Sequence, residues 1–232
     1  MRSLMSLLVF GALAFAGWQA LLWAEAEYPE HLPWTPLSLA HPPGMATAMK
    51  VAALSGDKPA CLALFEESPL AVTPIDDRME SEQCGLVDAV ALETMTASYN
   101  PGTVRLGCPL AASLAIWEQH VVQPAAERLL GSPVATIDHY GTYSCRRLYG
   151  RSEGRWSAHA TAEAIDITGF RLEDGRRIQL KSDWTGDDET AAFLRVIRDE
   201  GCSVFGTLLG PDYNAAHADH FHLQVTGFGT CR

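Results

Sequence analysis

AIDITGFRLEDGRRIQL, residues 164–180, is the part of the chain with the clearest local fold. Its first half, Ala164 to Phe170, alternates in polarity as a half-buried β-strand does. Glu173-Asp174-Gly175 then predicts a turn, and Arg177 to Leu180 returns as a second strand. The stretch therefore predicts a β-hairpin, in which Asp166 is a lone carboxylate between two isoleucines.

Further strands and a helix lie around this hairpin in the sequence. Val134 to His139 and Phe221 to Val225 are short and β-prone, so they predict strands. A helix is predicted from about Asp188 to Glu200, ending at Gly201, with four side chains inward: Ala192, Leu194, Val196 and Ile197. Helices combined with an antiparallel hairpin predict an α+β domain, a small antiparallel sheet with flanking helices.

The longest helical pattern opens at Cys108-Pro109, where proline suits a first helical position. Apolar residues recur at three-to-four spacing, at Leu110, Leu114, Trp117, Val121, Ala125 and Leu129. Gly131 predicts the end of this helix. Pro124 lies inside the pattern, so we expect it to kink or split the helix.

Composition and charge exclude several classes of protein. The chain has 232 residues, a formal net charge of −11, 47% hydrophobic residues and 19% charged residues. The apolar fraction is ample for a packed core, which excludes bulk disorder. A strong acidic balance argues against a nucleic-acid binder and against adhesion to anionic lipid by charge alone.

The N-terminal 26 residues indicate export. Leu4 to Trp23 carries no charged side chain, Arg2 precedes this run, and Glu25 follows it. Such a run can just span a bilayer with the N-terminus inside. Ala24-Glu25-Ala26 also has the pattern of a signal-peptidase site, so an uncleaved anchor and a cleaved signal peptide both remain open. Either one places the rest of the chain in the periplasm or another extracytoplasmic space, with the inner membrane as a partner of an uncleaved segment.

Residues 27–60 differ in character from the rest and predict a proline-rich linker. Five prolines fall between residues 29 and 43, without sustained periodicity. The one regular element that this segment suggests is a short helix over Ala46 to Leu54. The domain proper is then predicted to occupy residues 61–232.

Six cysteines support the extracytoplasmic assignment. Their number is even, none forms a C-x-x-C pair, and three disulfides in an oxidising compartment are expected. The sequence leaves the pairing open, since six cysteines allow fifteen connectivities. The candidates are Cys61, Cys84, Cys108, Cys145, Cys202 and Cys231.

A cluster of histidines near the C-terminus predicts a metal site. His217, His220 and His222 fall within six residues, and His220 and His222 share one face if the segment is a strand. His159 and Asp166 add an imidazole and a carboxylate in the region of the hairpin. Two histidines and one aspartate leave an open position on a tetrahedral Zn²⁺, which is the catalytic pattern rather than the closed structural one.

These motifs resemble those of a known group of enzymes. Ser157-x-His159 followed by Ala162, Ala164 and Asp166, with a late His-x-His, is similar to the LAS metallopeptidases, which include lysostaphin-type enzymes and D-alanyl-D-alanine carboxypeptidases. The His217-x-x-His220-x-His222 tail most resembles the penicillin-insensitive murein endopeptidases. From about Cys61 to Cys231 the chain resembles the bacterial extensin-like C-terminal domain family. The stretches that carry this likeness are residues 141–146, 159–166 and 205–217.

The resemblance to the LAS group implies an LAS-type fold and roles for particular residues. His159, Asp166 and His222 match its zinc ligands, and His220 matches a histidine that assists catalysis. His217 matches an extra histidine of the murein endopeptidases. Asp219 occupies the place of a glutamate base, so Asp219, His217 and His220 all remain candidates for the base.

Further candidate residues lie outside this set. Arg146 resembles the arginine that binds a substrate carboxylate, with Arg147 as its competitor. Tyr213 is a candidate for lining the cleft, and Asp212 could do the same or shape a turn. Ala162 stands where the group has glycine, so a positive φ there would strain the backbone.

The function implied by this set is an exported zinc-dependent peptidase. It would hydrolyse peptidoglycan peptide bonds, of D,D- or L,D-type, as an endo- or carboxypeptidase. A zinc-containing module that binds the cell wall without cleaving it is the alternative, because a fold does not guarantee an activity. A disulfide scaffold without metal is the third possibility.

Overall fold

A mixed sheet of seven strands forms the centre of the computed structural model, which describes residues 2–227 and 229–232. Its strand order is β12-β10-β11-β8-β7-β5, and β9 pairs with β8. The strands are β5 (Ser98–Asn100), β7 (Val134–Gly141), β8 (Ala164–Leu172), β9 (Arg177–Gln179), β10 (Thr207–Leu209), β11 (Phe221–Gln224) and β12 (Thr230–Cys231). Helices accompany this sheet, so the predicted α+β class is confirmed.

The predicted hairpin is present as β8 and β9, with Phe170 opposite Ile178. The centre of the sheet is antiparallel, as expected, because β7, β8, β11 and β10 pair in that way. The two edges differ from the expectation, since β5 and β12 each join in parallel. These edge strands have three and two residues, which is too short to show an alternating pattern.

Two smaller sheets between residues 71 and 107 were not predicted from the sequence. One has the order β1-β4-β6 and the other pairs β2 with β3. Their strands are β1 (Ala71–Pro74), β2 (Arg78–Ser81), β3 (Cys84–Leu86), β4 (Ala89–Thr94) and β6 (Arg105–Gly107).

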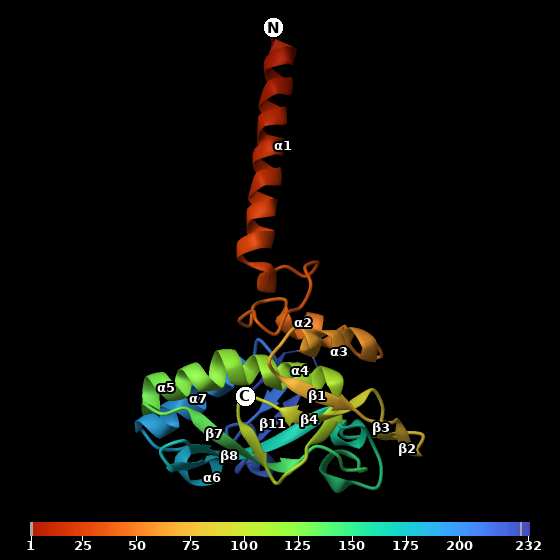
Figure 1. Ribbon diagram of the computed structural model, residues 1–232, viewed down its shortest axis with the longest axis vertical. Helices are drawn as coiled ribbons and strands as arrows, with labels where there is room; N and C mark the ends of the chain where they lie inside the picture. Colours follow the sequence, from red (N-terminus) through yellow and green to blue (C-terminus); the bar gives the residue numbers. More distant parts are fainter. Residues whose placement is uncertain (1, 228) are drawn as a thin grey trace.

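The long predicted helix runs across one face of the main sheet (Figure 1). It consists of α4 (Cys108–Trp117), a π-helical segment (Glu118–Val122) and α5 (Gln123–Leu130). Pro124 lies at the start of α5, where its missing N–H cannot continue the α-helical ladder. The helix is nevertheless not split, and the irregularity expected near Pro124 is the π-helical segment just before it. Gly131 ends α5 with a φ of 68°.

Every residue of α4 is buried, although the sequence predicted a helix with one apolar face. Figure 1 shows the reason, since α2 (Thr47–Ala52) and α3 (Lys58–Glu66) cover the side of α4 that faces away from the sheet. A helix that is apolar on all sides is typical of such a buried position.

The proline-rich segment is more ordered than a free linker. Leu39 is buried in the core, and its carbonyl oxygen lies 2.9 Å from Nε2 of His120. Lys50 Nζ donates to the carbonyl oxygen of Pro29 and to Oγ1 of Thr35, both at 2.7 Å. The segment therefore packs onto α4 between the N-terminal helix and the domain.

The predicted helix near residue 190 is α7 (Glu189–Gly201), which follows the short α6 (Leu180–Asp183) and packs against α5. Its inner face is shifted from the predicted one. Phe193 and Ala191 are buried with Leu194 and Ile197, whereas Ala192 and Val196 are only partly buried. Trp117 fixes this packing, because its indole Nε1 donates to the carbonyl oxygen of Ile197 at 2.9 Å.

The N-terminal helix α1 (Arg2–Glu27) projects away from the domain (Figure 1). The most apolar stretch within its segment Met5–Glu27 has a mean hydropathy of 1.8, which makes this helix the one candidate membrane span in the described part of the chain. The helix indicates a signal or an anchor.

All six cysteines form disulfides, as predicted. The pairs are Cys61–Cys108, Cys84–Cys145 and Cys202–Cys231. Three disulfides, together with the N-terminal helix, indicate an extracytoplasmic location.

A carboxyl group that the sequence did not single out is buried at the start of the π-helical segment. Glu118 accepts hydrogen bonds from the backbone N–H of Ala97 at 3.0 Å and from the hydroxyl of Tyr99. Burial raises the pKa of Glu118 to about 7, although these hydrogen bonds act in the opposite direction.

The raised pKa of Glu118 predicts a pH-dependent stability. The folded protein keeps this proton between pH 4.5 and about 7, where the unfolded chain has lost it, so stability falls as the pH rises through that range. At about 1.4 kcal/mol per pKa unit, the free energy of unfolding is roughly 3 kcal/mol lower above this pH range than below it. Glu118→Gln should therefore raise the free energy of unfolding at pH 8 and leave it unchanged at pH 4.5.

Urea unfolding of the full chain in one detergent at both pH values measures this difference. Glu127→Gln, an exposed carboxylate on α5, is the matched control and should have the parent pH profile. A Glu118→Gln protein with that same profile would contradict the assigned pKa.

Candidate metal centre

Two neighbouring strands and one turn bring the predicted ligands together. Asp166 of β8 lies directly opposite His222 of β11 in an antiparallel pair. Side chains opposite each other in such a pair point to the same face of the sheet. His159 joins them from a 3₁₀ turn, Ala158–Thr161, that immediately precedes β8. The three predicted ligands therefore meet at one place, although 63 residues separate His159 from His222.

The ligand atoms form a small triangle. His159 Nε2 lies 3.2 Å from Asp166 Oδ2 and 3.2 Å from His222 Nδ1, and His222 Nδ1 lies 2.9 Å from Asp166 Oδ1. Tetrahedral Zn²⁺ with bonds of about 2.0–2.1 Å sets its ligand atoms about 3.3 Å apart. The observed spacing fits such an ion with small adjustments.

Hydrogen bonds on the outer side of each imidazole define its tautomer. His159 Nδ1 lies 3.0 Å from the carbonyl oxygen of Thr142, which can only accept, so Nδ1 carries the proton. His222 Nε2 lies 3.1 Å from Oε1 of Gln224. The amide nitrogen Nε2 of Gln224 donates to the carbonyl oxygen of Thr226 at 2.8 Å, and this bond orients the amide so that Oε1 faces His222. The proton of His222 is therefore on Nε2.

These tautomers leave three acceptors facing one another. Nε2 of His159 and Nδ1 of His222 both present lone pairs toward the carboxylate of Asp166. A cation between three converging acceptors would satisfy all of them, and this donor set suits Zn²⁺.

The turn that holds His159 has a strained residue at its end. Ala162 is fully buried with a φ of 54°, which confirms that this position needs the left-handed conformation. Its carbonyl oxygen accepts from the N–H of Gly107 at 3.0 Å, and this bond anchors the turn to the start of α4.

His220 lies beside the three candidate ligands, and a hydrogen bond to Asp219 orients its ring. Its Nδ1 is 2.9 Å from Oδ1 of Asp219, and its Nε2 is 3.6 Å from Oδ1 of Asp166. The hydroxyl of Tyr140 donates to the other oxygen of Asp219 at 3.1 Å. Asp219 thus contacts His220 rather than the ligands, so of the candidate bases His220 is better placed and Asp219 positions it.

His217, the third candidate base, is a neutral imidazole. Burial first, then the nearby His220 and His222, lower its pKa to about 4. Its Nδ1 lies 2.8 Å from Oδ1 of Asn214, an oxygen that also accepts from the N–H of Ala216 at 3.0 Å. The proton of His217 is therefore on Nδ1, and Nε2 has a free lone pair.

A cavity of about 530 Å³ opens in front of these histidines. Arg146 and Tyr213 line it, as the sequence predicted. Arg147 does not, because its guanidinium lies 4.4 Å over the ring of Trp156. Arg155 and Tyr149 also line the cavity. No sequence motif identified these two residues, because they reach the cavity only when the loop that carries them pairs with itself.

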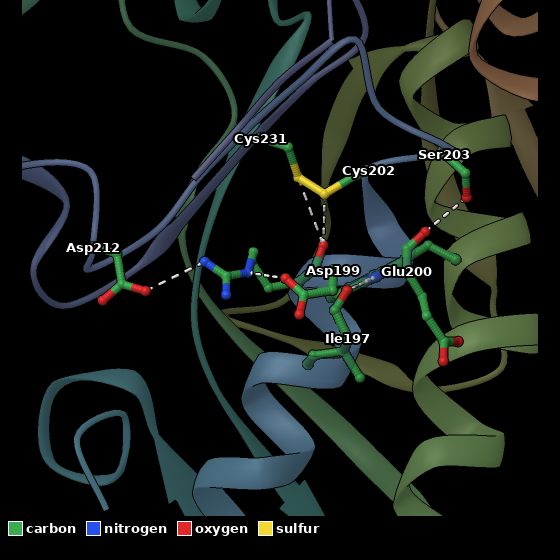
Figure 2. The surroundings of a disulfide bond; sticks show 9 residues. Ile197, Asp199, Glu200, Cys202, Ser203, Asp212 and Cys231 are labelled. Carbon is green, nitrogen blue, oxygen red and sulfur yellow. Dashed lines mark hydrogen bonds and ion pairs between the residues drawn. A yellow bond between two sulfur atoms is a disulfide. The ribbon is translucent and has the colours of Figure 1, made fainter.

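Hydrogen bonds on the side away from the cavity hold the loop that carries Tyr213. Asp212 accepts from the indole Nε1 of Trp184 at 2.8 Å and from Nη1 of Arg198 at 3.3 Å, so it shapes the loop rather than lining the cavity. Figure 2 shows Asp212 near the Cys202–Cys231 disulfide, which attaches the C-terminus to the end of α7.

The geometry predicts one bound Zn²⁺ per chain. His159→Ala should abolish stoichiometric binding, because one of three protein ligands is lost. Gln224→Leu should weaken binding by about 10- to 100-fold, because it removes only the outer hydrogen bond of His222. Metal analysis after dialysis of the full chain against a graded chelator series measures both effects.

His41→Ala is the control, since His41 lies outside this cavity and should leave zinc binding unchanged. Stoichiometric zinc of parent affinity in His159→Ala would contradict the ligand assignment.

Comparison with known proteins identifies the family of the chain. No curated protein and no solved structure matches it. The model of the family described as extensin-like protein C-terminus matches residues 59–232, which include the three candidate ligands and all six cysteines. The chain therefore belongs to the extensin-like protein C-terminus family.

Proposed function

We propose that this protein is an exported zinc-dependent peptidase that hydrolyses peptide bonds of peptidoglycan. The observation that carries the proposal is the set of three converging acceptors, His159, Asp166 and His222, on the wall of a large cavity. Three protein ligands leave an open position for water or substrate, and a closed structural site lacks one. When bound, Zn²⁺ in such a site acidifies water and polarises the scissile carbonyl.

The residues around the ligands supply acid–base chemistry. His220 can accept a proton at Nε2 while its Nδ1–H stays bonded to Asp219. The Asp219 carboxylate stabilises the imidazolium that results, and Tyr140 keeps this carboxylate in place. His220 can then return the proton to the leaving amine.

Cationic and aromatic groups at the cavity support a peptide substrate. Arg146 offers a fork of donors that matches a carboxylate, and Tyr213 offers an apolar ring with a polar end. The disulfides and the N-terminal helix support a location outside the cytoplasm. Peptidoglycan peptides are rich in carboxylates and lie in that space, which is why we favour them as substrates.

The test uses the full chain, purified in detergent with its disulfides formed and loaded with Zn²⁺. We expect it to release D-alanine from muropeptides or to split a cross-linked dimer, with products identified by mass spectrometry. A chelator should stop the reaction. Stoichiometric zinc without any product would contradict the peptidase and favour a wall-binding module.

Two variants separate the roles of the residues behind the ligands. His220→Gln should lower kcat by about 10²- to 10⁴-fold with zinc retained, because it removes the proton acceptor. Asp219→Asn should cost less, since it removes only the group that positions His220. Steady-state kinetics on one muropeptide, with His41→Gln as the unaffected control, measures the difference. Equal rates for His220→Gln and the parent would exclude His220 as the base.

A further inference from the structure

A short two-stranded arm, residues 146–157, borders the cavity. Arg147 and Trp156 form an antiparallel bridge, with the N–H of Ser157 bonded to the carbonyl oxygen of Arg146 at 3.1 Å. The N–H of Leu148 bonds to the carbonyl oxygen of Arg155 at 3.0 Å. Side chains alternate between the two faces of such a pair. One face thus carries Arg146, Leu148, Arg155 and Ser157, and all four line the cavity.

On the other face of the arm, the cation of Arg147 has its own interaction partners. The guanidinium of Arg147 stacks on Trp156 and donates to the carbonyl oxygen of Gly154. On the cavity face, no ion pair is formed by Arg146 or Arg155 within the described part of the chain. Asp166 is the one carboxylate among the described residues that line this cavity, and it belongs to the ligand set. The cavity is therefore cationic in a protein whose net charge is −11.

The pairing also sets the spacing at which the two arginine side chains leave the arm. Arg146 is opposite Ser157, so Arg155 is its diagonal neighbour across the arm. Diagonal neighbours lie about 7–8 Å apart, with their Cβ atoms somewhat closer, which is within reach of long side chains. Two carboxylates separated by about one residue of a peptide match this distance.

We propose that Arg146 and Arg155 form a two-point clamp for a substrate peptide that carries two carboxylates about one residue apart. This inference rests on the proposed peptidase function and deepens it by naming the substrate class. Each guanidinium binds one carboxylate by charge-assisted hydrogen bonds. The clamp holds the peptide against the cavity wall, with the histidine cluster in front of it.

Contacts at the tip of the arm hold the clamp in register with the histidines. Tyr149 adopts a φ of 58°, and its hydroxyl accepts from Nδ2 of Asn214 at 3.3 Å. The same Asn214 accepts from Nδ1 of His217. The arm is thus connected to the catalytic side of the cavity before substrate binds, and such preorganisation lowers the entropic cost of binding.

The test measures binding of a synthetic tetrapeptide, L-Ala-γ-D-Glu-L-Lys-D-Ala, which has two carboxylates flanking lysine. Four forms are compared, with both carboxylates free, either one amidated, or both amidated. Every protein is full-length, zinc-loaded and carries His220→Gln so that the peptide stays intact. We expect Arg155→Gln to weaken binding of the free form by about tenfold, as loss of one charged hydrogen-bonded pair does.

The clamp predicts a specific coupling between side chain and carboxylate. Arg155→Gln should have no further effect on one of the two singly amidated peptides, and Arg146→Gln should have none on the other. Arg151→Gln is the matched control, because Arg151 lies in the same arm but does not line the cavity. It should change the affinity by less than about twofold, the size of a screened surface charge effect.

Two outcomes would overturn the clamp. One is an equal loss for all four peptides in Arg155→Gln, and the other is a loss of the same size in Arg151→Gln. Failure of the clamp and failure of the peptidase are distinguishable. Hydrolysis by the parent without the coupling would overturn the clamp alone, whereas the coupling without hydrolysis would support the clamp and contradict the peptidase.

Discussion

The convergence of three hydrogen-bond acceptors on one point is the constraint around which the rest of the structure is arranged. Asp166 and His222 are opposite each other in the β8–β11 pair, and His159 reaches them from a turn that ends in a strained alanine. A partly buried carboxylate beside two unprotonated imidazole nitrogens is costly without a cation. The rings donate their outer hydrogen bonds to oxygens of Thr142 and Gln224, which hold both rings in the orientation that a metal requires.

The scaffold around this point is fixed by contacts far from it. The disulfide between Cys202 and Cys231 joins the C-terminus to the end of α7, where Arg198 also holds Asp212. The N–H of Gly210 bonds to the carbonyl oxygen of Arg232 at 2.6 Å, so the loop with Tyr213 is attached to the C-terminus as well. These links keep the loop that bears His217 beside the sheet that bears the ligands, which is the precision that a reactive site needs.

The sequence predicted what depends on local pattern and missed what depends on tertiary contacts. Alternation along β8 and the β-prone residues of β11 were enough to place Asp166 and His222 on strands. Pro124 marked an irregularity in a helix, and Gly131 marked its end. The inner face of α7 was wrong by about one residue, because Phe193 is selected by packing against the sheet and not by spacing alone. Arg155 and Gln224 carried no motif, since each acquires its role only when distant segments meet. The likeness to the LAS group supplied the ligand set, and the family match places the chain in the extensin-like family without assigning a reaction.

X-ray absorption at the zinc edge of the full-length, zinc-loaded protein is the most direct test of the proposed metal centre. We expect an inner shell of two imidazoles, one carboxylate oxygen and one further light atom at about 2.0 Å, with no sulfur. Asp166→Asn should alter that shell. A shell that contains sulfur at about 2.3 Å, or one that is the same in the parent and in Asp166→Asn, would contradict the metal centre at His159, Asp166 and His222.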